Sequence, residues 1–423
     1  MQKEKNHNYF FIIVLTISLV IITTNLIASK VISRIGHKIN LECTSLPKQE
    51  VPIIKEIKLT GNLSQMKYFF DALKQTKGHA VRIAHFGDSG LEGDMITSSL
   101  REDLQKKFGG SAVGFMSITS PDIMFRTTTR QSFSDNWKSL SVLSNNPNNI
   151  PLGISGYVYI PQGISWVKYV ATGWHGYLNN FSCVKLYYSN AKNSSIIYSF
   201  NDGVKQNSNL LTGNEIHELK LYAPSGVSNS IKISTTQPDQ AYFYGVSLEN
   251  GNGIYVDNFA WPMNTGLGFQ NISESNIKQF DSFLNYKLLI LTFGIYQGTY
   301  NSNSDKWYEN QMIKVIENLK KDFPQASILL MGVADKSIKK GTSFITDPRV
   351  PQLLKIQQDI VSKTGIAFWN FFEAMGGYGS MVKWVNATPP LAVLDYAHPS
   401  ELGSAEIGQM LAKVLIDAYN NSK

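Results

Sequence analysis

The chain has 423 residues, of which 43% are hydrophobic, 12% aromatic and 17% charged. This aromatic-rich, charge-poor composition excludes a disordered chain, and two cysteines are too few for a disulfide scaffold or a cysteine-rich metal site. The net charge of +7 is not gathered into any block of lysine or arginine, so we expect no nucleic-acid partner.

The first element is an uncharged, strongly apolar run at residues 9–28. A helix of that length spans roughly the 30 Å hydrocarbon core of a bilayer, whereas the apolar region of a signal peptide has ~7–15 residues. We therefore predict an N-terminal membrane anchor at 1–30, followed by a linker at 31–55. A cleaved signal peptide is the alternative, and either interpretation places the rest of the chain outside the cytoplasm, in the periplasm or at the cell surface.

The two cysteines lie far apart, with Cys43 in the predicted linker and Cys183 well inside the following region. Because exported proteins keep disulfides, these two residues could be bonded. Two unrelated thiols are the alternative, and the sequence does not decide between them.

A strand–turn–helix unit follows the linker. Residues 80–86 are mostly apolar with β-branched side chains, which predicts a buried strand, and residues 87–90 (GDSG) end it. Asp94 can cap a helix in which apolar residues recur every four positions as far as Phe108. We assign residues 56–114 to the first part of an α/β domain.

The pattern changes between residues 115 and 250. Short segments rich in Val, Ile, Tyr and Ser alternate there with clusters of Asn, Gly and Pro. This spacing is typical of an all-β sandwich or jelly roll.

The α/β alternation returns in residues 251–423. Apolar runs predict buried strands, and amphipathic stretches between them predict helices; the strands are at 287–293, 326–333 and 366–369, and the helices at 307–323, 351–363 and 401–419. Such alternation predicts a parallel sheet covered on both faces. The simplest architecture is one α/β domain whose first strand–helix unit is separated from the rest by a β-rich insertion.

Three polar residues near the predicted sheet are candidates for catalysis. Ser89 follows the first strand and precedes a helix, while Asp395 and His398 lie in a loop just before the last helix. A serine becomes a nucleophile when a histidine takes its proton and an acid orients that histidine. In open α/β sheets such groups lie at the carboxyl ends of the strands.

These motifs resemble those of the SGNH/GDSL hydrolases, and in particular of membrane-tethered bacterial peptidoglycan O-acetylesterases. The resemblance covers roughly residues 75–112 and 250–420. It implies a flavodoxin-like three-layer fold with a parallel sheet, and related esterases carry a carbohydrate-binding-like β domain that would correspond to the 115–250 insertion.

The resemblance also implies roles for individual residues. The first block matches at HFGDSG, with Ser89 as the nucleophile, and the last matches Asp395 and His398 as the orienting acid and the base. The second block, in which a glycine N–H donates to the oxyanion, matches best at Gly266 and less well at Gly253.

One block departs from the family pattern of Gly-x-Asn, whose Asn side chain donates to the oxyanion. Gly294 aligns with the family glycine, but Tyr296 stands where Asn is expected. Losing one oxyanion donor costs ~10²–10³ in turnover. The O–H of Tyr296 or the amide of Gln297 could take its place.

The resemblance therefore implies a serine esterase that removes O-acetyl groups from an extracytoplasmic glycan, namely peptidoglycan, with no cofactor and no metal. Two alternatives remain open from the sequence: an O-acetyltransferase with the same triad, and a catalytically weakened glycan-binding protein. The expected partners are the acetylated glycan and the membrane, the latter through the N-terminal helix.

Overall fold

The computed structural model describes residues 54–120, 123–173, 178–236, 241–294 and 302–422, which lie in one compact unit, Glu50–Lys423. The predicted anchor and Cys43 fall outside these ranges. None of the described helices is both long and apolar enough to cross a bilayer. Cys183, in β8, is a free cysteine among the described residues, and neither of the two alternatives for Cys43 and Cys183 is tested.

A six-stranded sheet organises the α/β part, with the strand order β1-β19-β16-β15-β2-β14. The strands are β1 (Thr60–Gly61), β2 (Ala80–Gly87), β14 (Gly253–Ala260), β15 (Tyr286–Thr292), β16 (Ser327–Met331) and β19 (Ala367–Trp369). All pairs are parallel except that of β1 with β19. Numbered along the chain, the parallel strands are arranged 2-1-3-4-5, which is the flavodoxin-like order. The order reverses between β2 and β15, where ligands bind in such sheets.

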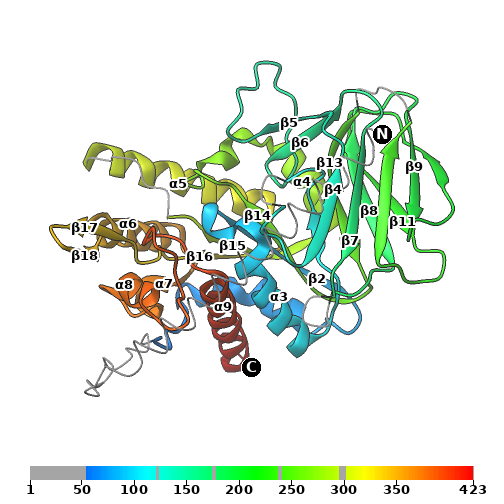
Figure 1. The fold of residues 1–423 in the computed structure, drawn as a ribbon. Coiled ribbons are helices and arrows are strands. Elements are labelled where there is room, and N and C mark those ends of the chain that lie inside the picture. Colours follow the sequence, from blue (N-terminus) through cyan, green and yellow to red (C-terminus); the bar gives the residue numbers. More distant parts are fainter. Residues whose placement is uncertain (1–53, 121–122, 174–177, 237–240, 295–301, 423) are drawn as a thin grey trace, which may run out of the picture. The chain divides into compact units, whose positions relative to one another are not determined.

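Helices cover both faces of this sheet (Figure 1), as the sequence predicts. One buried cluster joins the sheet to α2 (Lys67–Leu73), α3 (Met95–Phe108) and α9 (Glu401–Asn421). A second cluster joins the opposite face to α4 (Glu274–Leu284), α5 (Ser302–Asp322) and α6 (Arg349–Thr364). The shorter elements around them are η1 (Leu63–Met66), η2 (Ser89–Asp94), η4 (Leu267–Asn271), α7 (Phe371–Ala374), α8 (Ser380–Val385) and the hairpin β17–β18 (Ser337–Lys340, Ser343–Thr346).

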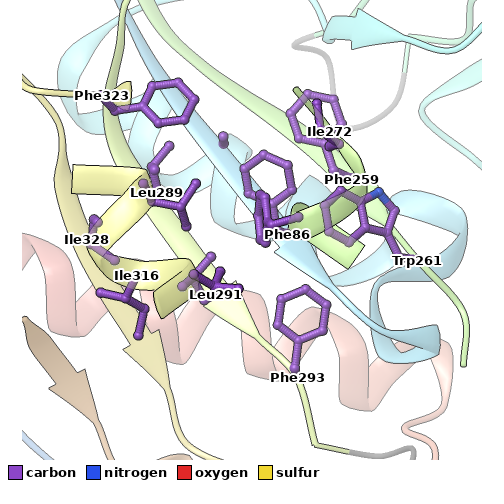
Figure 2. Close-up of a cluster of buried hydrophobic side chains, with 14 of the residues drawn as sticks. Phe86, Phe259, Trp261, Ile272, Leu289, Leu291, Phe293, Ile316, Phe323 and Ile328 are labelled. Atoms are coloured by element: carbon purple, nitrogen blue, oxygen red, sulfur yellow. The ribbon is translucent and has the colours of Figure 1, made fainter. Parts of the chain in front are cut away.

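Aromatic side chains fill the second cluster beneath the carboxyl end of β2 (Figure 2). The ring of Phe86 lies 4.8 Å from those of Phe259 and Phe269 and 5.4 Å from that of Trp261, measured between centroids. Such tilted and edge-on pairs contribute about 0.5–1.5 kcal/mol each beyond the area they bury. The Trp261 indole N–H donates to the Ser155 carbonyl oxygen at 2.7 Å, which links this packing to the β-rich region. The end of β2 therefore rests on a rigid base.

The region between α3 and β14 forms two antiparallel sheets. One has the order β10-β9-β12-β7-β4 and the other β11-β8-β13-β6-β5, with β3 also paired to β13. Side chains of both sheets meet in a single buried cluster, so the sheets pack face to face. Their strands are β3 (Gly114–Met116), β4 (Thr129–Phe133), β5 (Trp137–Ser141), β6 (Tyr157–Pro161), β7 (Trp166–Ala171), β8 (Cys183–Ser189), β9 (Ser195–Phe200), β10 (Gln206–Asn209), β11 (His217–Tyr222), β12 (Ser230–Thr235) and β13 (Tyr242–Glu249).

A buried ionic group joins the two regions. Arg82 of β2 pairs with Asp257 of β14 at 3.1 Å and with Glu249 of β13. Asp257 also accepts hydrogen bonds from the Tyr286 hydroxyl at 2.7 Å and the Phe115 N–H at 2.8 Å. Breaking such a buried pair costs ~3–5 kcal/mol because it leaves an uncompensated charge. This group therefore fixes the β-rich region against the sheet that bears Ser89.

Two local expectations differ from the structure. Asp94 occupies the N-cap position of α3 but makes no capping hydrogen bond, because both its carboxylate oxygens accept from Arg101 at 2.9 Å. Residues 253–260 form a strand, although the sequence analysis did not separate them as one. Their polar residues, Asp257 and Asn258, pair with side chains of neighbouring elements, so they are tolerated inside the sheet.

Candidate active site

The turn after β2 holds Ser89 at the carboxyl edge of the sheet. Ser89 begins η2, and the Asp88 side chain caps this short helix by accepting from the Gly90 N–H at 3.0 Å. The other carboxylate oxygen of Asp88 accepts from the Gly294 N–H at 2.8 Å, and the Asp88 N–H donates to the Thr292 carbonyl oxygen at 3.2 Å. These bonds tie the turn to the end of β15, across the point where the strand order reverses. Asp88 lies inside the GDSG motif, but the sequence alone did not indicate this role.

The structure brings together the three residues that the motifs indicate. Ser89 Oγ lies 2.9 Å from His398 Nε2, and His398 Nδ1 lies 2.6 Å from Asp395 Oδ2. Asp395 Oδ1 accepts from the backbone N–H groups of Ala397 and His398 at 2.9 and 3.0 Å. Asp395 thus binds both the ring and the backbone of His398, and it fixes the direction in which the ring points.

Packing holds the loop that contains Asp395 and His398. The Val393 N–H donates to the His398 carbonyl oxygen at 3.0 Å, and Ser400 caps α9 with its side chain directly after the loop. Tyr396 has a left-handed backbone (φ 59°), and its ring stacks on Phe344 of β18 with centroids 3.7 Å apart. The sequence did not predict the β17–β18 hairpin that supplies this contact.

Hydrogen bonds favour the ionised form of Asp395. Burial alone would raise the pKa of Asp395, but hydrogen bonds from the backbone and ring of His398 and from Ala397 outweigh it and lower that pKa. An ionised carboxylate at Nδ1 keeps the ring proton on that nitrogen. The Nε2 atom of neutral His398 is therefore an acceptor, suited to the Ser89 O–H.

A second histidine lies beneath the turn and stays uncharged. His85 of β2 is buried, and its ring nitrogens lie 3.1 Å from Thr97 Oγ1 and 2.9 Å from Thr292 Oγ1. Burial lowers the pKa of His85 to about 3. His85 therefore supports the strand end as a neutral hydrogen-bonding group.

The glycines expected to donate to an oxyanion are already hydrogen-bonded. The Gly266 N–H donates to Asn264 Oδ1 at 2.8 Å, and the Gly294 N–H donates to Asp88. Either amide would have to share or exchange its bond to serve an oxyanion, so both roles stay predictions. Gly253, the weaker candidate, is the first residue of β14, at the end of the sheet opposite Ser89.

The remaining site expectations concern Tyr296, Gln297 and metals. Both residues fall outside the described ranges, so their predicted oxyanion roles stay predictions. Within the described ranges, no group of three or more His, Cys, Asp or Glu side chains is placed so that it could hold a metal ion.

A small apolar cavity of about 40 Å³ lies directly against the Ser89 turn and the His398 loop. Its volume is enough for a group of about three non-hydrogen atoms. Its lining includes Asp88, Gly90, Gly294, Met381, Trp384 and Ala397. The residues on either side of Ser89 in the chain therefore border an apolar space.

The fold and these contacts define a doubly wound α/β protein with a Ser-His-Asp arrangement at its switch point. No protein-family model and no curated protein matches the sequence. Among solved structures, the chain is similar to one described as "Peptidoglycan O-acetylesterase in action", with 22% identity and a TM-score of 0.71 over 86% of this chain and 99% of that one. The predicted resemblance is thus confirmed for the fold.

Two further structural neighbours are family two carbohydrate esterases. The one from Cellvibrio japonicus has 10% identity and a TM-score of 0.26, covering 70% of this chain and 100% of that one. The one from Clostridium thermocellum, in complex with cellohexaose, has 9% identity and a TM-score of 0.25 over 66% and 98%. These scores are too low to compare sites.

Proposed function

We propose that the protein is a serine esterase of the SGNH type that removes O-acetyl groups from an extracytoplasmic glycan, with peptidoglycan as the substrate. The observation that supports this proposal most directly is the continuous hydrogen-bonded series Ser89–His398–Asp395 at the switch point of the sheet. The fold likeness to a structure described as a peptidoglycan O-acetylesterase agrees with it. The anchor at residues 1–30 is part of the proposal and would hold the catalytic region at the outer face of the membrane.

The chemistry follows from the proton positions. His398 Nε2 takes the Ser89 proton as Oγ attacks the acetyl carbonyl carbon, and Asp395 stabilises the imidazolium that forms. The tetrahedral oxyanion receives the Ser89 N–H and a second donor, for which Gly266, Gly294, Tyr296 and Gln297 are the candidates. His398 then protonates the sugar oxygen as its bond to the acetyl carbon breaks, which releases the sugar hydroxyl and leaves an acetyl-serine. Water, deprotonated by His398, releases acetate and restores Ser89.

Solvent access favours hydrolysis over transfer. The side chains of His398 and Asp395 are 37% and 47% exposed, so water can reach the proposed acyl-enzyme. A transferase would have to keep water away from that intermediate. The cavity of about 40 Å³ beside the Ser89 turn favours a small acyl group such as acetyl.

The test is acetate release by the purified full-length protein from acetylated peptidoglycan and from a chromogenic acetyl ester. Ser89→Ala should lower the rate by about 10⁴-fold or more, since loss of a triad nucleophile has this effect. Ser64→Ala removes a hydroxyl from η1, remote from the site, and should leave the rate unchanged. Equal rates for wild type and Ser89→Ala on both substrates would refute the proposal.

A further inference from the structure

A second cavity, also of about 40 Å³, lies where the β-rich region meets the Ser89 turn. Glu92 of η2 lines it, as do Asn258 and Ala260 at the end of β14 and side chains from the β-rich region. Glu92 follows Ser89 by three residues, so their Cα atoms are at most ~11 Å apart. A substituent on the same glycan could therefore occupy this cavity while an ester lies at Ser89.

An arginine, Arg126, lines the cavity, and two of its donor atoms make no hydrogen bond within the described ranges. The Arg126 side chain is 7% exposed, and within the described ranges neither its Nε nor its Nη2 has a hydrogen-bond partner. These two atoms form one edge of the guanidinium group, and their parallel N–H bonds match a carboxylate bidentately. Buried donors without a partner destabilise a charged group, so a ligand that pairs them is bound more tightly.

The carboxylate that pairs with Arg126 is shared with a second arginine. Arg126 Nη2 lies 3.2 Å from Asp94 Oδ2, as an ion pair without a hydrogen bond. Asp94 is already bound bidentately by Arg101 and accepts from the Thr128 hydroxyl at 2.7 Å. One carboxylate therefore faces two guanidinium groups. Glu92 also lines the cavity, but the ion pair of Arg126 is with Asp94.

Other polar atoms at the cavity are also unused. Gln131 Oε1 and Ser155 Oγ are buried, line the cavity and have no partner within the described ranges. The Ser155 hydroxyl can donate to a carboxylate, and Gln131 can accept from a neighbouring N–H or O–H of the same substituent. A space of this size holds a carboxyl group but not a sugar ring.

We infer that this cavity is a subsite for a carboxylate carried by the glycan close to the ester, with Arg126 as its bidentate partner. The inference rests on the proposed function, since it places the carboxylate on the substrate of Ser89. It makes the enzyme selective for acetylated sugars that carry an acidic substituent over neutral ones.

The test compares an O-acetylated sugar that carries a carboxylate with the same sugar in which that carboxyl is a carboxamide. Wild type should show higher kcat/KM on the carboxylate form, mainly through a lower KM. Arg126→Gln should reduce this preference by about ten- to a hundredfold, as expected for charge-assisted hydrogen bonds. Arg126→Lys keeps the charge but lacks the fork, so it should restore only part of the preference.

Arg130→Gln is the matched control. The substitution removes the same charge as Arg126→Gln, but Arg130 lies on the exposed side of β4. Its preference should equal that of wild type. Equal kcat/KM for the two sugars in wild type, or an equal loss of preference in Arg130→Gln, would overturn the subsite.

A binding measurement separates this subsite from the esterase proposal. The deacetylated carboxylate sugar and its carboxamide are titrated calorimetrically into full-length wild type and Arg126→Gln. Tighter binding of the carboxylate that depends on Arg126 would support the subsite even if no ester were cleaved. Equal binding of both sugars would refute the subsite while leaving the esterase proposal standing. The unfolding temperature of each variant is measured alongside. If Arg126→Gln is destabilised, the binding of the two sugars by Arg126→Lys is compared with that by wild type instead, and equal binding of both sugars by wild type would still refute the subsite.

Discussion

Asp395→Asn tests how the candidate site sets the direction of proton transfer. In the structure one carboxylate oxygen faces His398 Nδ1 at 2.6 Å, while the other accepts from the N–H groups of Ala397 and His398. An asparagine can keep its carbonyl oxygen on the two backbone donors, so the loop should retain its conformation. Its NH₂ group would then face Nδ1, which favours the tautomer protonated on Nε2.

In that tautomer Nε2 donates rather than accepts, and it no longer takes the Ser89 proton. The corresponding change in serine hydrolases lowers turnover by about 10⁴-fold, or about 5.4 kcal/mol of transition-state stabilisation at 1.36 kcal/mol per decade. We therefore expect kcat on a chromogenic acetyl ester to fall by about that factor.

The assay is kcat/KM from pH 5 to 9, together with the unfolding temperature of each variant. Asp347→Asn is the matched control, because Asp347 also accepts a backbone N–H, that of Arg349 at 2.9 Å, in the turn before α6 and outside the Asp395–His398 loop. It should keep wild-type activity. If Asp395→Asn retained more than about a tenth of wild-type kcat while folding normally, the assignment of Asp395 as the orienting acid would be wrong.

Three further predictions concern stability and acyl size. Burial lowers the pKa of His85 to about 3, so its contribution to the free energy of unfolding is present above pH 6.5 and is lost as the pH falls toward 3. His85→Gln should therefore reduce the slope of the unfolding free energy against pH on the acid side by up to about 1.4 kcal/mol per pH unit, as measured by urea unfolding. Burial raises the pKa of Asp281 to about 6, so its contribution is present at low pH and is lost as the pH rises through 4 to 6. Asp281→Asn should lose less stability than wild type over that rise, by about 1–2 kcal/mol after allowance for its partial exposure, and parallel curves would contradict this. Met381→Ala enlarges the apolar cavity beside the Ser89 turn. It should raise the ratio of butyryl to acetyl ester turnover about tenfold and lower the free energy of unfolding by ~2–5 kcal/mol. An unchanged ratio in a folded variant would show that the acyl group does not enter this cavity.

The sequence predicted the elements that depend on local pattern. Apolar runs predicted β2, β15, β16 and β19 to within two residues of their ends, because strands buried on both faces are apolar throughout. Helix α5 begins at Ser302, earlier than the Trp307 that the apolar stripe indicates, since its first turns are polar. Ser89, Asp395 and His398 were identifiable because short motifs place them directly after a strand or before a helix.

Features that depend on contacts between distant residues were not predictable. The strand β14 contains Asp257, which looks unsuitable for a sheet core until Arg82 and Tyr286 are placed beside it. Arg126 reads as an ordinary polar residue of a loop, and only the packing of the β-rich region against η2 buries its side chain. The role of such a buried polar residue can be assigned only when its partners are known, and those partners are far away in the sequence.

The central claim is that Ser89 is a nucleophile activated by His398, and covalent labelling tests it most directly. The full-length protein is treated with a fluorophosphonate that labels activated serines, and the labelled residue is located by peptide mass spectrometry. The account predicts one label on Ser89 in wild type, and labelling of Ser89 slowed by at least about 10³-fold in His398→Ala. An unlabelled Ser89 in wild type, or equal labelling rates in the two proteins, would contradict it.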